Sequence, residues 1–199
     1  MLVRISMRII DYFLDLKENL LSINKLTVLQ NFKNINHLVD NTLSMDEPYN
    51  LNISYDNSFI EIKKNVLFRS FCNIMIYANA KLILNDNIFF NNYCSINCLG
   101  EIVIGENTIF GEGVKIYDHN HSYSFQENAL IVERNDFKIG IVHIGKNCWI
   151  GSNVTILANV IIGDNVIVGA NNLIYKSLPS NVIVKAKHEL IIEPYDNKG

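Results

Sequence analysis

The stretch "IYDHNHSYS", residues 116–124, contains the side chains in this sequence best suited to chemistry. Asp118, His119 and His121 lie within four positions there. An unperturbed imidazole titrates near neutral pH, so a histidine held in fixed geometry can act as a general base and take a proton from a hydroxyl group. In a plain polar turn the same residues would have no chemical role, so their interpretation depends on the surrounding elements.

A repeat of six residues surrounds this stretch. A period of six fits neither an α-helix nor a simple strand, and is typical of a β-helix in which each side of a coil is a short strand followed by a turn. One aliphatic residue per side points inward, and glycine is expected where the backbone bends into unusual φ and ψ. We therefore predict an all-β solenoid with three sides and about 18 residues per coil. The clearest aliphatic positions are Ile144, Ile150, Ile156, Ile162, Val168 and Ile174.

The same register runs back through Ile104, Phe110 and Ile116 and is broken by a protruding loop at residues 118–142. Loops of this length inside a compact domain are uncommon and usually functional. Residues 50–83 alternate like strands in a looser register and are interpreted as the first, degraded coils. The repeat therefore places "DHNH" at the mouth of a functional loop, held by a rigid coil.

Outside the repeat, residues 1–45 are predicted to form a helical, amphipathic segment, because Ile9, Phe13, Leu16 and Leu20 recur at helical spacing. The β-helix is expected over residues 46–190 and a tail over 191–199. Attachment of the first segment to a membrane surface is the alternative, but its polar face mixes acids with bases. No apolar run is long enough to span a membrane. The default expectation is a soluble cytoplasmic protein with no membrane association.

The composition narrows the function classes. The hydrophobic fraction of 49% excludes a disordered chain, and the net charge of −3 gives no electrostatic footprint for nucleic acid. Four cysteines form no CxxC pair and are expected to be small buried hydrophobic residues.

Residues 84–184 resemble the hexapeptide-repeat (left-handed β-helix) acyltransferases, most closely the sugar O-acetyltransferases that act on galactosides, maltose, and capsule or lipopolysaccharide. The resemblance rests on four stretches. It implies a left-handed helix, a homotrimer, acetyl-CoA as co-substrate, no required metal and a small-molecule or glycan acceptor. The matching stretches are "FFNNYCSIN", "IGENTIFGEGVKIYDHNH", "IGKNCWIGSNVTIL" and "IIGDNVIVGANNLIYKSLPSNVIV".

Residue by residue, the resemblance places the catalytic general base on His121, which would deprotonate a sugar hydroxyl for attack on the thioester. It leaves Asp118 and His119 to shape the loop or touch the acceptor. Asn91, with Asn92 as the off-by-one alternative, matches an acceptor-contacting asparagine. Trp149 should point outward, into the substrate groove or a subunit interface. Contacts with acetyl-CoA carry over to Ser152, Ala170, Tyr175 and Lys176.

The chain departs from the family in places that affect substrate identity. "KAKHELII" replaces the usual closing run with its arginine or lysine, so Lys185 and Lys187 are the candidates for holding the CoA phosphates. An acidic acceptor-binding residue of the galactoside enzymes falls on Leu99, and Ser122 replaces the proline after the histidine. The resemblance therefore does not identify the acceptor.

The expected activity is acetyl-CoA-dependent O-acetylation of a sugar or surface-glycan precursor. Two other acetyl transfers stay open, to a nucleotide amino sugar or to serine. A γ-type carbonic anhydrase needs three metal-binding histidines, and only His121 and His143 could approach one another. A non-catalytic solenoid module is the remaining alternative.

Overall fold

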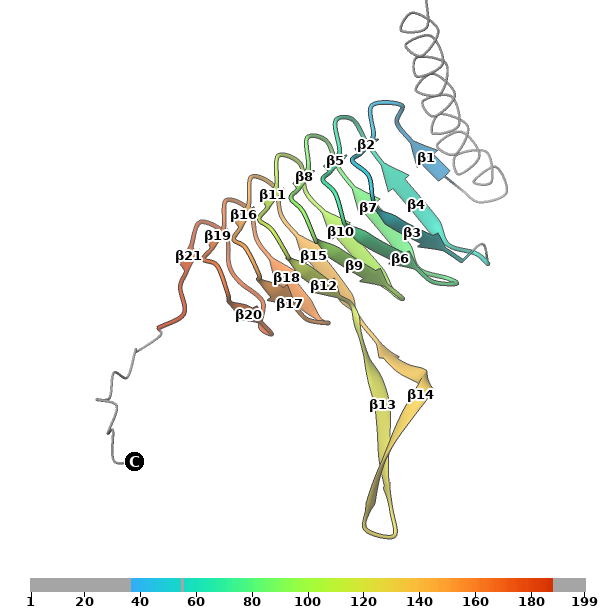
Figure 1. The fold of residues 1–199 in the computed structure, drawn as a ribbon. Coiled ribbons are helices and arrows are strands. Elements are labelled where there is room, and N and C mark those ends of the chain that lie inside the picture. The colour runs from blue at the N-terminus through green and yellow to red at the C-terminus, as the bar shows by residue number, and fades with distance from the viewer. Residues whose placement is uncertain (1–36, 55, 188–199) are drawn as a thin grey trace, which may run out of the picture.

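The computed structural model describes residues 37–54 and 56–187. Within these ranges the chain is all-β and forms a parallel β-helix with three faces, from which one hairpin projects (Figure 1). This confirms the predicted left-handed β-helix class. The amphipathic helix predicted near the N-terminus and the C-terminal tail lie outside the described residues.

Three parallel sheets make the faces of the solenoid, and successive strands belong to successive faces. Sheet A contains β1 (His37–Val39), β4 (Phe59–Ile62), β7 (Lys81–Leu84), β10 (Glu101–Ile104), β15 (Ile141–Ile144) and β18 (Val160–Ile162). Sheet B contains β2 (Ser44–Met45), β5 (Leu67–Phe68), β8 (Phe89–Phe90), β11 (Ile109–Phe110), β16 (Trp149–Ile150), β19 (Ile167–Val168) and β21 (Ile183–Val184). Sheet C contains β3 (Asn50–Ile53), β6 (Asn73–Ile76), β9 (Ser95–Cys98), β12 (Lys115–Tyr117), β17 (Thr155–Ile156) and β20 (Leu173–Ile174). We name the edges between the sheets the AB, BC and CA corners.

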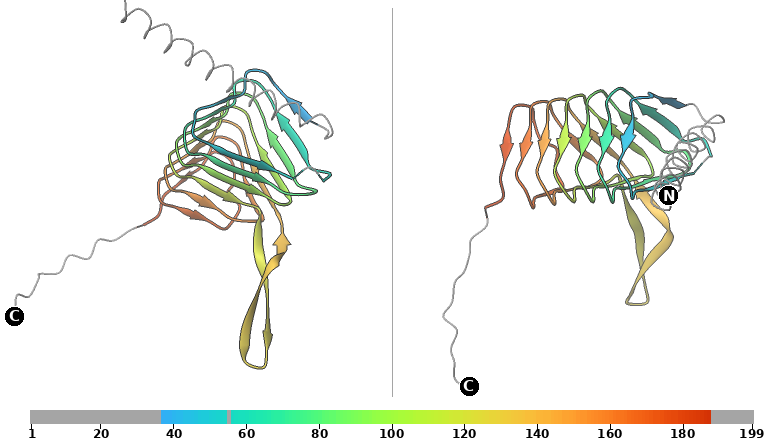
Figure 2. Two further views of the ribbon diagram at one scale, coloured as in Figure 1. Left: turned by 45° about the vertical axis from the view of Figure 1, so that its right-hand side comes forward. Right: turned by 45° about the horizontal axis from the view of Figure 1, so that its top comes forward.

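The coils are larger at the N-terminal end than the six-residue repeat predicts. Paired inward residues are 22 positions apart between Ile60 and Leu82, but 18 apart between Val142 and Val160. Residues 50–83 are therefore complete coils rather than degraded ones, with strands of four residues on sheets A and C. Figure 2 shows the solenoid narrowing towards its C-terminal end.

The first coil begins earlier than the domain boundary predicted at residues 45 and 46. β1 pairs with β4 and β2 pairs with β5, so residues 37–45 belong to the solenoid. The sequence pattern did not indicate strands over residues 37–45, because strands of two or three residues carry almost no periodic signal.

The core is a set of inward ladders that bury one aliphatic or aromatic side chain above another. Phe68, Phe90 and Phe110 stack with ring centroids 4.4 Å apart at each step. Each fully buried side chain of this size contributes about 1.5–3 kcal/mol of hydrophobic stabilisation. The four cysteines are free and buried, as predicted, in the same ladders: Cys72, Cys94, Cys98 and Cys148.

Glycine and asparagine have separate roles at the turns. Glycine was expected at the bends with unusual φ and ψ, but asparagine occupies most of these positions. A Cβ on Gly151 would lie 2.6 Å from the backbone nitrogen of Ala170, so glycine permits close approach between coils. Gly113 alone among the described glycines has a left-handed φ. Asparagine fills most other left-handed positions, and at the AB corner its side-chain amides hydrogen-bond from coil to coil. This ladder consists of Asn65, Asn87, Asn107, Asn147, Asn165 and Asn181.

The loop predicted at residues 118–142 is an antiparallel hairpin of β13 (His119–Gln126) and β14 (Ala129–Ile139). It leaves the solenoid at the CA corner between β12 and β15 (Figure 1). The solenoid register continues across it, since Ile102 of β10 pairs with Val142 of β15. Among the described residues there is no helix long and apolar enough to cross a membrane.

Candidate active site

Asp118 anchors the root of the hairpin. Its side chain occupies the inward ladder position that Ile76 and Cys98 fill in the two preceding coils, and it is fully buried. The carboxylate accepts hydrogen bonds from the backbone N–H of Leu99, at 2.9 and 3.0 Å, and of Gly100, at 2.7 Å.

These bonds replace part of the regular coil-to-coil ladder. In the preceding coil the N–H of Tyr77 donates to the carbonyl of Cys98. At the equivalent Leu99 the side-chain carboxylate accepts instead, because the carbonyl of Asp118 accepts from Gly140 N at 2.7 Å. Burial, and then the negative charge of Asp118, raise the pKa of the Cys98 thiol. The Asp118 carboxylate therefore fixes the start of the hairpin to the preceding coil, and the Asp118 carbonyl holds its end at Gly140.

The first histidine of the motif is oriented by this carboxylate. His119 Nδ1 lies 3.0 Å from Asp118 Oδ1, and the His119 side chain is 15% exposed. The rings of Tyr77, Tyr117 and Phe137 meet the imidazole edge-on. A buried acid that accepts from Nδ1 fixes the orientation of an imidazole and directs Nε2 outward.

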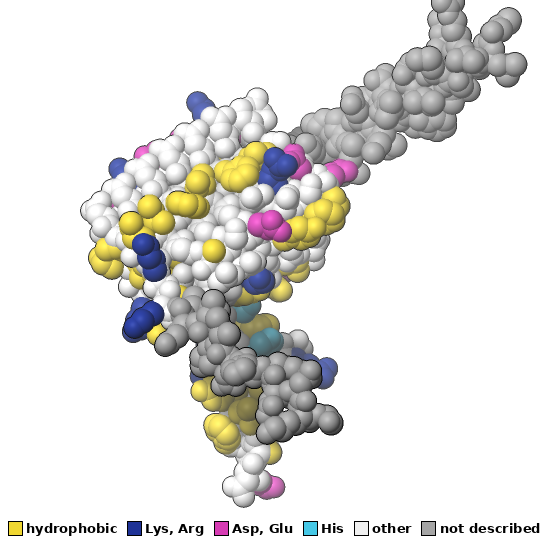
Figure 3. All heavy atoms as spheres, turned by 60° about the vertical axis from the view of Figure 1, so that its left-hand side comes forward, with side chains coloured by type: hydrophobic (Ala, Val, Ile, Leu, Met, Phe, Trp, Pro, Cys, Tyr) yellow, Lys and Arg dark blue, Asp and Glu magenta, His cyan; other side chains and the backbone are white. Residues whose placement is uncertain are grey.

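The second histidine is oriented by the returning strand. His121 Nδ1 lies 2.9 Å from the carbonyl oxygen of Glu133. A carbonyl can only accept, so Nδ1 carries the hydrogen and the lone pair is at Nε2. His121 is exposed and lies against Phe137, with ring centroids 4.7 Å apart. Histidine side chains are visible where the hairpin leaves the solenoid (Figure 3).

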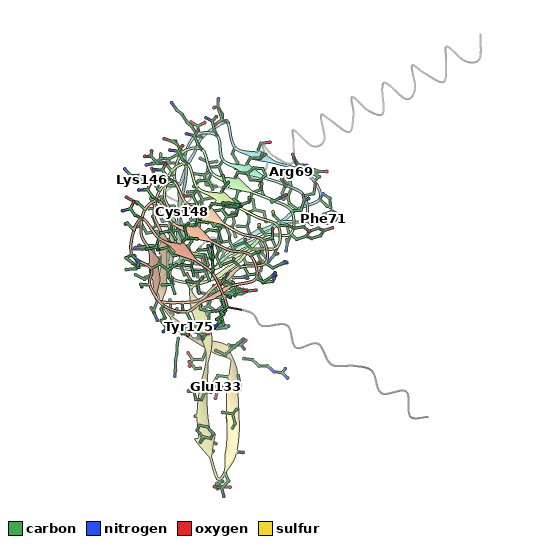
Figure 4. All side chains as sticks on the ribbon, turned by 90° about the vertical axis from the view of Figure 1, so that its left-hand side faces the viewer. Arg69, Phe71, Glu133, Lys146, Cys148 and Tyr175 are labelled. Atoms are coloured by element: carbon green, nitrogen blue, oxygen red, sulfur yellow. The ribbon has the colours of Figure 1, made fainter. Side chains whose placement is uncertain are left out.

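Two predicted CoA-contacting residues lie on the same corner as the hairpin. Tyr175 and Lys176 follow β20, two coils beyond β12, and are exposed. Figure 4 shows Tyr175 on the side of the solenoid from which the hairpin projects. Lys176 Nζ lies 5.3 Å from the centre of the Tyr175 ring, within cation–π range.

The other predicted site residues lie along the BC corner. Ser152 and Ala170 occupy adjacent coils there, and the carbonyl of Ser152 accepts from Asn171 N at 2.8 Å. Asn91 lies at the same corner in an earlier coil, where its side chain accepts from Asn92 N at 2.8 Å.

Trp149 lies beside this corner on the outer surface of sheet B, as predicted. It is 53% exposed and pairs with Ile109 and Ile167 of the neighbouring coils. The predicted site residues thus form two groups, one at the CA corner and one at the BC corner. Sheet C separates these corners within a single chain.

Sequence reasoning missed the groups that orient the histidines. The Glu133 carbonyl and the Phe137 ring reach the site through β14, whose register against β13 shifts between His121 and Tyr123. Tyr77 comes from a coil 42 positions before His119, at a corner that the regular repeat did not mark. No local sequence pattern marks a backbone carbonyl as the hydrogen-bond partner of a histidine. Only the pairing of β13 with β14 could have suggested the contact between His121 and the Glu133 carbonyl.

His143 has a different environment from the motif histidines. It lies on the outer face of sheet A, where Nε2 is 2.6 Å from Glu101 Oε1. Lys81 Nζ lies 2.9 Å from Glu101 Oε2. Hydrogen bonds from Lys81, then from His143, hold the pKa of Glu101 below its usual value. Across residues 37–54 and 56–187, no three His, Cys, Asp or Glu side chains are grouped so that they could hold a metal ion.

Comparison with known proteins identifies the repeat. Residues 141–176 match the family described as bacterial transferase hexapeptide (six repeats). The match covers two coils of the solenoid, from β15 to β20. No curated protein matches the sequence significantly.

Solved structures share the fold. A point mutant of AntD, an N-acyltransferase from Bacillus cereus in complex with dTDP and coenzyme A, has 24% sequence identity and a TM-score of 0.53, with 75% of each chain covered. The polysialic acid O-acetyltransferase OatWY has 23% identity and a TM-score of 0.52, with 83% of this chain and 91% of OatWY covered. At these identities the similarity shows a common architecture.

Proposed function

We propose that this protein is an acetyl-CoA-dependent O-acetyltransferase whose acceptor is a hydroxyl of a sugar or surface-glycan precursor. The observation that carries the proposal is the hydrogen bond between His121 Nδ1 and the Glu133 carbonyl, 2.9 Å long, on an exposed imidazole. It leaves Nε2 basic and accessible, as a general base requires.

Transfer would proceed directly, without a covalent enzyme intermediate. Nε2 of His121 takes the proton of the acceptor hydroxyl as its oxygen attacks the thioester carbonyl carbon. When the carbon–sulfur bond breaks, the CoA sulfur takes that proton from the imidazolium. The Glu133 carbonyl keeps the ring oriented and stabilises the imidazolium through Nδ1–H. The Asp118–His119 pair would hold the root of the hairpin and shape the acceptor pocket.

The division of site residues between two corners supports an active site built by two copies of the chain in a homotrimer. The CA corner carries His121, Tyr175 and Lys176, whereas the BC corner carries Asn91, Ser152 and Ala170. Placing the BC corner of one copy beside the CA corner of the next would complete the site. The small, accessible residues Ser152 and Ala170 leave room there for the pantetheine arm of acetyl-CoA.

The test is thiol release from acetyl-CoA with a panel of sugars, oligosaccharides, amino-sugar nucleotides and free serine. We expect release that depends on a hydroxyl acceptor and falls by about 10²–10⁴-fold in His121→Ala. His143→Ala is the matched control, because it removes an imidazole that is held by Glu101 on sheet A.

Two outcomes would contradict the proposal. An active His121→Ala protein combined with an inactive His119→Ala protein would move the base to His119. Release only with amino-sugar nucleotides would make the protein an N-acetyltransferase and bring it closer to AntD, an N-acyltransferase.

A further inference from the structure

Two aromatic residues stand at positions of the BC corner that disfavour them. Phe71 and Tyr93 have φ of 63° and 62°, in the left-handed region. Bulky side chains are rare there because Cβ crowds the following carbonyl. The equivalent positions of the next three coils hold Gly113, Asn153 and Asn171, residue types that adopt this conformation more easily. Such an exception suggests that the rings themselves are needed.

The rings form a stacked pair on the surface. Their centroids are 4.9 Å apart with an interplanar angle of 8°, and Phe71 and Tyr93 are 51% and 52% exposed. Figure 4 shows Phe71 at an edge of the solenoid, away from the corner with Lys146 and from the hairpin with Glu133.

The stack ends at Tyr93, because the next coil has Gly113 at this position. A Cβ on Gly113 would lie 2.5 Å from Asn153 Oδ1, so an amide rather than a third ring follows Tyr93. Aromatic surface and hydrogen-bonding groups therefore lie side by side.

The surroundings are polar. Ser70, Asn92 and Glu112 occupy the adjoining positions of successive coils, and Arg69 forms an ion pair with Asp46 at 3.1 Å. Charged residues are depleted in the centre of protein–protein interfaces. A sugar ring suits such a site better, because its C–H face packs on an aromatic ring while its hydroxyl groups hydrogen-bond at the rim.

We propose that Phe71 and Tyr93 are a stacking platform for a sugar ring of the acceptor, separate from the ring that is acetylated. Asn91, expected to contact the acceptor, and Ser152, expected to contact CoA, lie along the same corner. The place of the platform in catalysis rests on the proposed function. With a second sugar bound there, the acceptor is an oligosaccharide or polymer rather than a single sugar.

The test measures saccharide binding by calorimetry without acetyl-CoA. The probes are methyl glycosides and matching tetrasaccharides of galactose, glucose, N-acetylglucosamine and N-acetylneuraminic acid. The variant Phe71→Asn/Tyr93→Asn places at both positions the residue that the later coils use, so the fold should be retained. We expect one tetrasaccharide to bind the wild type and to bind this variant about tenfold more weakly, with acetyl-CoA affinity unchanged. Leu38→Asn, which replaces an exposed apolar side chain on sheet A, is the control.

Equal tetrasaccharide affinity in wild type and variant, or no saccharide binding by the wild type, would overturn the platform. A third contrary result is a variant with unchanged saccharide affinity but a lower sedimentation coefficient than the wild type. The last would make the pair a contact between copies. The binding assay contains no acetyl-CoA, so it tests the platform independently of acetyl transfer. If the wild type lacks transferase activity but binds a tetrasaccharide more tightly than the double variant does, the proposed function is rejected and the platform is kept.

Discussion

At the scale of single residues, the anchoring of Asp118 is the main structural departure from the repeat. The Asp118 carboxylate occupies a ladder position that aliphatic or thiol groups fill in the preceding coils. Its burial is compensated by three hydrogen-bond donors, the N–H groups of Leu99 and Gly100 and the Nδ1 of His119. Burying a carboxylate is tolerated only when hydrogen bonds compensate for lost hydration. The consequence is a rigid exit point for the strand that carries both histidines.

Asp118→Ala should destabilise the protein by about 2–4 kcal/mol, because it leaves the buried N–H of Leu99 and the partly buried N–H of Gly100 without an acceptor. Urea unfolding measures the loss. Asp86→Ala is the control, since its carboxylate accepts one backbone N–H at an exposed turn and should cost about 1 kcal/mol or less. Equal losses in the two variants would mean that burial adds nothing to the Asp118 anchor.

Glu101 gives a pH-dependent prediction. Lys81 and His143 lower the pKa of Glu101, so its contribution to stability is present above the unfolded pKa of about 4.3 and is lost as pH falls through the lower folded value. Glu101→Gln should therefore destabilise the protein at pH 7, by about 1 kcal/mol or less because the pair is partly exposed. In urea unfolding at pH 3 the difference should shrink, and a constant difference would exclude the charge as its source.

At the scale of the elements, the turns rather than the strands set the geometry of the coil. Many strands have only two residues, and most corners have one residue in the left-handed region. Asparagine occupies most of these positions and also hydrogen-bonds along the AB corner, with Nδ2 to Oδ1 distances of 3.0 and 3.2 Å on either side of Asn107. The asparagines at these turns therefore have a structural role.

Replacing Asn107 separates the two roles of asparagine. Asn107→Ala loses the ladder bonds and places an ordinary Cβ at φ 56°, and should cost about 2–3 kcal/mol in unfolding free energy. Asn107→Gly loses the same bonds but keeps the backbone conformation, and should cost about 1 kcal/mol less than Asn107→Ala. If thermal unfolding gives equal losses for the two variants, the lost ladder bonds rather than the backbone conformation account for the cost.

At the scale of the whole molecule, each coil contacts only its neighbours, so the solenoid is a rigid rod whose corners hold side chains at fixed spacing. The hairpin is the exception, projecting from one corner while the register beneath it continues. Its outward-facing apolar residues are 53–74% exposed at Tyr123, Phe125, Leu130 and Val132. A two-stranded hairpin is marginally stable alone, which is consistent with support from another copy.

A site shared between copies can be tested by mixing inactive variants. His121→Ala and Trp149→Ala should each lack activity alone, since the first removes the proposed base at the CA corner and the second removes a side chain beside the BC corner. After dissociation and random reassembly, about a quarter of the sites should combine an intact His121 with an intact Trp149 from a neighbour, so thiol release should recover to about a quarter of wild type. No recovery, with mixed oligomers confirmed by mass spectrometry, would place both residues in one subunit's site.

The class of fold could be predicted from the sequence, because a period of six is incompatible with helices and long strands. The outward position of Trp149 could be predicted too, since Trp149 directly precedes the inward Ile150. The burial of the four cysteines could be predicted from their small hydrophobic side chains. Asp118, His119 and His121 were identified as a group because they are adjacent in the chain. Adjacency and period are properties that a linear sequence carries directly.

Features that depend on contact between distant segments came from the three-dimensional structure. The 22-residue coils and the membership of residues 37–45 in the solenoid follow from strand pairing, since short strands have weak local signals. Glycine at Gly151 serves the approach of the next coil, which no local pattern reveals. The Glu133 carbonyl that orients His121 and the separation of the site residues between two corners depend on hairpin register and coil geometry. Both are set by packing across the solenoid, beyond the reach of sequence spacing.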